Sequence, residues 1–255
     1  MPTKLIAEIG TNWHPGKKYS LKAAVAKALE CGADLVKLQV FKADLLAKRR
    51  GCAVSDLKPW AIPINWLDEI LSDFVGDNGR SLVGISVFDA MHLMVMSSVW
   101  NVLPAFIKSA TQEYQYAALA DTMSDASDRL DIPLIVSMPP DAPLVVGNYS
   151  SPLKITWMLC IPRYPAPRSA YDLKRLIRMK NELPGCCVGV SDHTAYHPDF
   201  IPLAESWLSV HKEPAISCWE KHFCYDEDLR ANTPDSGSWA LGVESFKRLA
   251  EIVHA

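Results

Sequence analysis

Eight short apolar runs recur along the chain, and they limit its fold more than any other feature. The runs are Leu5–Ile9, Asp34–Val40, Leu82–Ser86, Ala105–Lys108, Pro133–Ser137, Lys154–Cys160, Cys187–Val190 and Ala215–Glu220. Short, continuously apolar runs are typical of strands buried on both faces, as in a parallel sheet covered by helices. The segments between them have helical character, namely Ser20–Cys31, Trp66–Val75, Ala170–Leu183, Phe200–Val210 and Val243–His254. The first of these opens with a candidate Ser20 cap and ends before Gly32.

Eight strands that alternate with helices predict an α/β protein with a (β/α)8 TIM barrel. The length of 255 residues suits this fold, because eight strand–helix units need roughly 250 residues. An open, doubly wound sheet is the alternative, but no Gly-x-Gly-x-x-Gly motif follows any of the runs. We therefore expect residues 1–255 to form one domain, a single barrel.

Composition excludes several classes of protein. Lys and Arg number 26 against 29 Asp and Glu, a net charge of −3, which argues against a nucleic-acid partner held by bulk positive charge. We see no signal peptide, and no apolar run approaches the roughly 18 residues of a membrane span. The seven cysteines include no Cys-x-x-Cys pair, so we expect reduced thiols in a cytoplasmic protein with no membrane partner.

Polar residues gather at the carboxyl ends of the predicted strands, which is where barrel enzymes place their active sites. These residues are Glu8, Lys37, Gln39, Ser86, Lys108, Thr111, Ser137, Cys160, Arg163, Tyr164, Ser191, His193, Glu220 and His222. A polar residue at one strand end is usually a cap or a loop former. Chemically functional residue types at all eight ends favour a site instead.

The residue types suggest an anion site. Two lysines, Lys37 and Lys108, are costly inside an apolar framework unless they pair with anions. Serine and threonine hydroxyls around them can donate to phosphate oxygens, which predicts a receptor for phosphate or carboxylate. Two imidazoles, His193 and His222, with a nearby glutamate are candidates to hold a divalent ion. A Schiff base at Lys37 is an alternative, although the ring of hydroxyls argues against it.

Several motifs follow one another in a recognisable order over about residues 5–240. They are Ala7-Glu8-Ile9-Gly10 with Asn12, Gly32–Lys42, Ser86-Val87-Phe88-Asp89, Lys108-Ser109-Ala110-Thr111, Cys160 with Tyr164-Pro165-Ala166-Pro167, Val188–Thr194, Glu220-Lys221-His222-Phe223 and Pro234-Asp235. In sequence and order they resemble the sialic acid (N-acetylneuraminate) synthase family. The resemblance implies a (β/α)8 barrel that condenses phosphoenolpyruvate with an N-acetylmannosamine-like aldose. The product is a sialic-acid-like 2-keto-3-deoxy sugar acid, formed with release of phosphate.

The same resemblance assigns roles to individual residues. A divalent Mn²⁺ or Mg²⁺ ion binds at the histidines that match His193 and His222. A glutamate matching Glu8 handles protons, and Glu220 lines the same cavity. The residues implied for phosphoenolpyruvate are Lys37, Ser86, Lys108, Thr111, Ser137 and Ser191, and those implied for the sugar are Gln39, Tyr164 and Asp235.

The sequence also departs from the family pattern. Family members carry a C-terminal antifreeze-like domain that sends an arginine to the partner subunit, whereas this sequence ends at Ala255. We expect that contact to be absent, and a homodimer would form between barrels. Pro162 stands where members that bind N-acetylmannosamine often carry asparagine. We therefore expect the sugar half of the site to be altered, and we hypothesise that Arg163 supplies part of the missing cationic contact.

Two other functions remain as alternatives. One is a synthase on the same barrel for another aldose or an aldose phosphate, as in the 3-deoxy-octulosonate and 3-deoxy-heptulosonate phosphate synthases. The other is a non-catalytic barrel that binds a sugar acid or a partner protein. In either case Trp13 and Trp239 flank the expected mouth loops and are candidates to stack on a sugar ring. Cys160 has no adjacent activating base in the sequence, so we expect it to pack.

Overall fold

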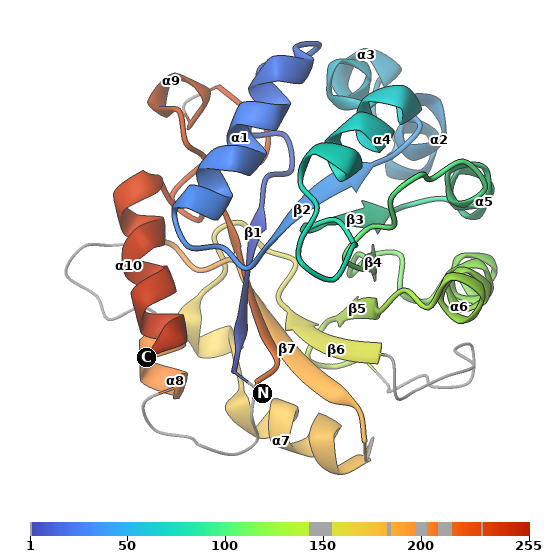
Figure 1. The fold of residues 1–255 in the computed structure, drawn as a ribbon. Helices are drawn as coiled ribbons and strands as arrows, with labels where there is room; N and C mark the ends of the chain where they lie inside the picture. Colours follow the sequence, from blue (N-terminus) through green and yellow to red (C-terminus); the bar gives the residue numbers. More distant parts are fainter. Residues whose placement is uncertain (1, 143–154, 183–184, 197–202, 209–215, 231) are drawn as a thin grey trace.

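Eight parallel strands close into a barrel in which each strand pairs with the next one along the chain (Figure 1). The computed structural model describes residues 2–142, 155–182, 185–196, 203–208, 216–230 and 232–255. The strands are β1 (Lys4–Glu8), β2 (Leu35–Val40), β3 (Val83–Val87), β4 (Ile107–Ser109), β5 (Leu134–Met138), β6 (Ile155–Cys160), β7 (Cys187–Asp192) and β8 (Cys218–His222). Each predicted run overlaps one strand, although Lys154 and Ala215 lie outside the described residues. The predicted (β/α)8 barrel is confirmed.

Helices surround the barrel and cover the outer faces of its strands (Figure 1). They are α1 (Lys18–Glu30), α2 (Ala43–Arg50), α3 (Val54–Leu57), α4 (Ile64–Asp73), α5 (Ala90–Ser97), α6 (Ala117–Leu130), α7 (Leu173–Glu182), α8 (Leu203–Leu208), α9 (Glu227–Arg230) and α10 (Val243–His254), with 3-10 turns at Lys58–Trp60 and Arg168–Ala170. The predicted helix ends at Leu183, Phe200 and Val210 fall outside the described residues. Within the described ranges, no helix combines the length and apolarity needed to cross a membrane.

Helix α1 shows how a local detail departed from the prediction. It begins at Lys18, and the Ser20 side chain does not cap it. Ser20 Oγ instead accepts a hydrogen bond from the backbone N–H of His14, at 2.9 Å, and so holds the loop after β1. At the other end, Gly32 has a φ of +95°, and a Cβ there would lie 2.8 Å from Cβ of Ala250. Glycine is required there because the chain turns closely against α10.

Alternation along each strand divides the barrel into an outer apolar face and an inner face with two layers. Outward side chains such as Leu5, Val36 and Ile85 belong to the main core, against the helices. Inside the barrel, a second cluster forms an apolar floor from Ile6, Phe106, Ile135, Met158 and Cys218. Because inward positions recur every two residues, the next layer above this floor holds the polar strand-end residues.

Strands β7 and β8 extend further than predicted, and an ion pair on their outer face explains why. The predicted runs ended at Val190 and Glu220, but the ladder continues through the Asp192–Lys221 pair. Lys221 Nζ lies 3.2 Å from Asp192 Oδ1 and donates to the carbonyl oxygen of Thr194 at 2.6 Å. Asp192 and Lys221 therefore face away from the barrel interior, while their neighbours Ser191, Glu220 and His222 face into it.

The packing of the floor predicts the effect of one substitution. A Cβ added at Gly84 would lie 2.3 Å from Cζ of Phe106. Gly84→Ala should therefore lower the free energy of unfolding by about 1–3 kcal/mol, measured by urea denaturation. Adding Phe106→Leu removes the clashing ring, so the double variant should be more stable than the sum of the two single effects predicts. An unchanged urea midpoint for Gly84→Ala would contradict this packing.

Candidate active site

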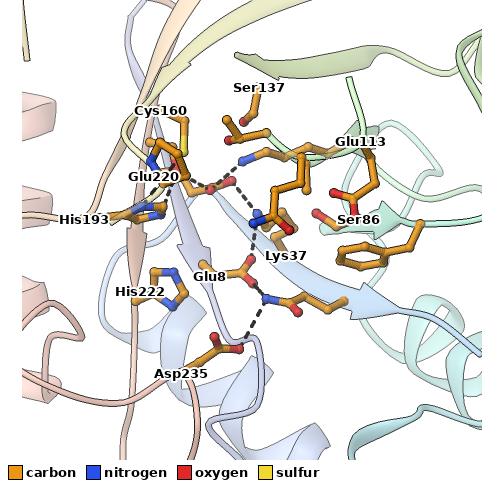
Figure 2. A pocket seen from close by; sticks show the side chains of 18 of the residues that line it. Glu8, Lys37, Ser86, Glu113, Ser137, Cys160, His193, Glu220, His222 and Asp235 are labelled. Atoms are coloured by element: carbon orange, nitrogen blue, oxygen red, sulfur yellow. Dashed lines mark hydrogen bonds and ion pairs between the residues drawn. The ribbon is translucent and has the colours of Figure 1, made fainter. Parts of the chain in front are cut away.

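The polar layer opens into one cavity at the carboxyl end of the barrel, and Figure 2 shows this cavity from close by. Strands and loops around the whole barrel contribute to it. The lining residues are Glu8, Lys37, Gln39, Arg50, Ser86, Phe88, Lys108, Ala110, Thr111, Gln112, Glu113, Ser137, Cys160, Pro162, Tyr164, Ser191, His193, Glu220, His222 and Asp235. Thirteen of the fourteen predicted site residues are therefore brought together, and Arg163 is the exception.

Glu220 lies at the centre of the cavity and binds three groups. Its carboxylate is 3.0 Å from Lys37 Nζ and 2.6 Å from Lys108 Nζ, and it accepts a hydrogen bond from Ser191 Oγ at 2.8 Å. All four side chains are buried. Burial alone would raise the pKa of Glu220, but the two ammonium groups outweigh it and hold that pKa well below its usual range. Glu220 is therefore ionised, as a buried lysine pair requires.

A chain of ion pairs and hydrogen bonds leads from this centre through Lys37 and Glu8 to Asp235 (Figure 2). Glu8 Oε2 lies 2.9 Å from Lys37 Nζ, and Gln39 Nε2 donates to Glu8 Oε1 at 2.8 Å. Gln39 Nε2 also lies 3.3 Å from Asp235 Oδ2, which accepts from the backbone N–H of Thr11. Burial raises the pKa of Glu8 despite the attraction of Lys37, and Glu220 adds to the rise. Glu8 therefore takes up a proton more readily than an ordinary glutamate does.

Two hydroxyls in the cavity lack hydrogen-bond partners. Ser86 Oγ and Ser137 Oγ are buried and make no hydrogen bond, although Ser86 is in register with Lys108 on the neighbouring strand. A buried polar group without a partner costs about 1–3 kcal/mol. A ligand that offers acceptor oxygens near Lys108 would remove this cost.

Two imidazoles face each other on the β7–β8 side, with ring centroids 5.3 Å apart. His193 Nδ1 is 2.8 Å from the carbonyl oxygen of Ile161, so Nδ1 is the donor, and in the neutral ring Nε2 carries the lone pair. Burial opposes the charged ring, but Cys160 and the carbonyl of Ile161 outweigh it and raise the pKa of His193. His222 Nδ1 is buried without a hydrogen-bond partner. Burial, followed by the neighbouring His193 and Lys37, lowers the pKa of His222 well below its usual value, so this ring is neutral.

These two rings fit a divalent metal ion with two protein ligands. A metal-binding histidine typically donates its other N–H to a backbone carbonyl, which matches His193, and the unpartnered nitrogen of His222 is available. Among the described residues, no group of three or more His, Cys, Asp or Glu side chains is arranged for a metal. Glu8 and Glu220 turn towards the lysines instead. Substrate or water would therefore have to complete the coordination.

Aromatic side chains form one wall of the cavity mouth. The ring of Tyr164 lies 4.3 Å from His193 and 5.6 Å from Trp239, measured between centroids. Trp13, expected at the mouth, is instead fully buried and meets Trp60 edge to face. The prediction that Trp13 stacks on a sugar was wrong, because the loop after β1 folds it into the core between the barrel and its helices.

Cys160 lines the cavity beside His193, with Sγ 3.9 Å from Nδ1. Burial disfavours its thiolate, but His193 and Lys108 lower the pKa of Cys160 to about 7. A neighbouring histidine is therefore present, contrary to the expectation from the sequence. It is not a base towards the thiol, because its Nδ1 donates to Ile161.

The structure places Arg163 away from the cavity and brings two unpredicted charged residues into it. Arg163 is exposed and lines a separate shallow depression with Tyr164 and Pro165–Pro167. Arg50, from the end of α2, and Glu113, from the loop after β4, line the main cavity. Neither lies at a strand end, so the pattern of strand ends gave no signal for them.

Comparisons with known proteins identify relatives of this chain. A relative, "Spore coat polysaccharide biosynthesis protein SpsE" of Bacillus subtilis (strain 168), is 26% identical over 98% of this chain. The chain spans 66% of that relative's length. The crystal structure of the B. subtilis protein matches with a TM-score of 0.72 and 25% identity, over 99% of this chain and 67% of that one.

A second solved structure supports the fold. The N-acetylneuraminic acid (sialic acid) synthetase of Leptospira borgpetersenii serovar Hardjo-bovis matches with a TM-score of 0.79 and 18% identity, over 99% of this chain and 83% of that one. The model of the NeuB family matches residues 122–255, more than half of the chain. On this match, the chain belongs to the NeuB family.

Proposed function

We propose that this barrel is a phosphoenolpyruvate-dependent synthase that joins the enol ester to an aldose and releases phosphate. The product is a 2-keto-3-deoxy sugar acid of the sialic-acid type. The observation that carries the proposal is the pair Lys37 and Lys108, buried beside the unpartnered hydroxyls of Ser86 and Ser137. Membership of the NeuB family supports a synthase, and the names of the relatives support a sugar acid or a polysaccharide precursor.

The lysines and hydroxyls bind the enol ester. Phosphoenolpyruvate carries a phosphate and a carboxylate, so Lys37 and Lys108 supply opposite charge at short range. Ser86, Thr111 and Ser137 donate hydrogen bonds to its oxygens, whereas Ser191, whose hydroxyl donates to Glu220, positions that carboxylate. Because Ser86 and Ser137 are fixed on strands β3 and β5, little reorganisation of these two donors is needed when the anion enters.

The aldose lies towards the imidazoles and the mouth. Gln39, Tyr164 and Asp235 contact its hydroxyls and orient its aldehyde carbon towards C3 of the enol ester. A divalent ion held by His193 and His222 would supply Lewis acidity at the aldehyde oxygen. No lysine adduct is needed, because C3 of the enol ester is itself the nucleophile.

Glu8 handles the proton of the second step. The C2=C3 electron pair forms the bond to the aldehyde carbon, which leaves C2 electron-poor and turns the aldehyde oxygen into an alkoxide. Water adds at C2 and Glu8 takes its proton, which balances the proton that the alkoxide takes up. The tetrahedral intermediate then loses inorganic phosphate by cleavage of the C2–O bond to the phosphate group, and the C2 hydroxyl gives its proton to the leaving phosphate and becomes the 2-keto group. A raised pKa suits Glu8 to this transfer near neutral pH.

The reaction is tested directly by phosphate release. The metal-stripped protein should release no phosphate from phosphoenolpyruvate and a panel of aldoses until Mn²⁺ or Mg²⁺ is added. The panel should contain N-acetylmannosamine, neutral hexoses and aldose phosphates, and mass spectrometry should identify the product. Metal binding without turnover on any aldose would support the non-catalytic alternative and contradict the proposal.

Two lysines at the same end of the barrel allow a matched comparison. Lys108 lines the cavity, whereas Lys42, just after β2, is exposed and lies outside the lining. Lys108→Met should weaken phosphoenolpyruvate binding about 10- to 100-fold, because a charged hydrogen bond contributes about 1.5–3 kcal/mol. Lys42→Met should leave the affinity unchanged in calorimetric titrations. Equal affinities in both variants would contradict the anion site.

Glu8→Gln separates proton transfer from binding. Glutamine keeps the shape and the contact with Gln39 but cannot take up a proton. The variant should lose about 100-fold or more in kcat, while the KM for phosphoenolpyruvate changes only a few-fold. A normal kcat would remove Glu8 from the mechanism.

A further inference from the structure

We propose that Arg50, held in place by Glu113, forms a subsite for a phosphate monoester at the edge of the cavity between α2 and the loop after β4. Neither residue belongs to the set that the sequence motifs imply. The inference rests on the proposed function only for the identity of the ester.

Arg50 keeps donors available to a ligand. It lines the cavity, and its side chain is partly exposed. Its guanidinium carbon lies 5.7 Å from the ring centroid of Phe88, and its Nη2 lies 3.6 Å from Glu113 Oε1. At 3.6 Å the contact is an ion pair and not a hydrogen bond. The planar fork that recognises phosphate is therefore not used by Glu113.

The adjacent arginine serves a different purpose. Arg49 donates from Nη1 to the carbonyl oxygen of Phe88, and its guanidinium carbon lies 4.7 Å from the ring centroid of Tyr116. It does not line the main cavity. Arg49 therefore fixes the end of α2 against the loops that follow β3 and β4, and so positions Arg50.

Glu113 gives independent support for a ligand at this edge. Its side chain is 1% exposed, and neither carboxylate oxygen accepts a hydrogen bond. Its nearest cations are Arg50 at 3.6 Å and Arg49 at 4.0 Å. A buried carboxylate this poorly satisfied is costly. It holds the guanidinium at the cavity wall by charge, while leaving its N–H groups for an incoming anion.

The charges elsewhere in the cavity show why a third cation is needed. Lys37 is shared by Glu8 and Glu220, and Lys108 also pairs with Glu220. The positive charge of both lysines is thus largely offset before any ligand binds. Among the described lining residues, Arg50 is the arginine or lysine that no hydrogen-bonded carboxylate neutralises. A phosphate dianion entering the cavity finds its additional cation there.

The test is calorimetric titration with inorganic phosphate, which needs no turnover. Arg50→Ala should weaken phosphate binding about 10- to 100-fold. Arg50→Lys should lose less, since it keeps the charge but not the fork. Arg163→Ala, which removes an exposed arginine outside the cavity lining, is the matched control and should bind like the unmodified protein. If Arg50→Ala also binds like the unmodified protein, the subsite is excluded.

A second variant guards against misfolding. Arg50→Ala leaves Glu113 buried with only Arg49 nearby, so the double variant Arg50→Ala, Glu113→Gln removes both charges. Its thermal midpoint should be near that of the unmodified protein, and its phosphate affinity should be as low as that of Arg50→Ala. A well-folded double variant with unchanged phosphate affinity would overturn the proposal.

Kinetics distinguish the two sources of the phosphate group. If the group belongs to phosphoenolpyruvate, Arg50→Lys should raise the KM for phosphoenolpyruvate and leave that of the aldose unchanged. If it belongs to a phosphorylated aldose, the aldose KM should rise instead. Both results support the subsite. If Arg50→Ala loses phosphate affinity but the unmodified protein turns over no substrate, the proposed reaction alone is overturned. If the unmodified protein turns over substrate but Arg50→Ala keeps its phosphate affinity, this inference alone is overturned.

Discussion

The carboxylate of Glu220, bound to two buried lysines, is the interaction on which the site depends. A barrel interior is ordinarily filled by layers of apolar side chains, and here one layer is ionic. The desolvation penalty of a buried ion pair can exceed its Coulombic gain, and apolar residues of similar volume often stabilise a protein more. The cluster formed by Lys37, Lys108 and Glu220 is therefore hard to explain by stability. It is consistent with a cavity that must receive an anion, because both lysine side chains are fixed in position by carboxylates before the ligand arrives.

The floor beneath the charges makes this layer possible. Phe106, which directly precedes β4, and Met158 of β6 fill the interior, while β3 and β7 contribute the glycines Gly84 and Gly189. A Cβ on Gly189 would lie 2.5 Å from Sγ of Cys218, so β7 carries no side chain at this point and leaves room for the Cys218 side chain of β8. The two glycines thus leave room for the ring of Phe106 and the sulfur of Cys218. Water is kept from the lower side of the ion pairs, which strengthens every electrostatic interaction above it.

Strand-end chemistry was predictable from the sequence because parallel strands bring their carboxyl ends together. The spacing of two residues put Lys37 and Gln39 on one face, and the structure confirms that both line the cavity. The loops and helix ends could not be predicted in this way. Arg163 adjoins Tyr164 in sequence yet points elsewhere, whereas Arg50 and Glu113 are distant in sequence and meet at the cavity. A strand's period fixes side-chain direction, but a loop's direction depends on what it packs against. Trp13 was misplaced for the same reason.

The order of the strands separates two kinds of chemistry within the cavity. In a closed barrel of eight strands in sequence order, β3 and β4 lie across from β7 and β8. The imidazoles of His193 and His222 therefore lie on the opposite side from Ser86 and Glu113, with Lys37 and Glu220 between them (Figure 2), and Arg50 lies beside Glu113. In the proposed reaction, the carbonyl to be polarised would bind at the first side and the phosphate to be expelled at the second. Bond formation and phosphate loss would then occur at different ends of one enol ester, so the aldehyde carbonyl and the phosphate would not compete for the same hydrogen-bond donors.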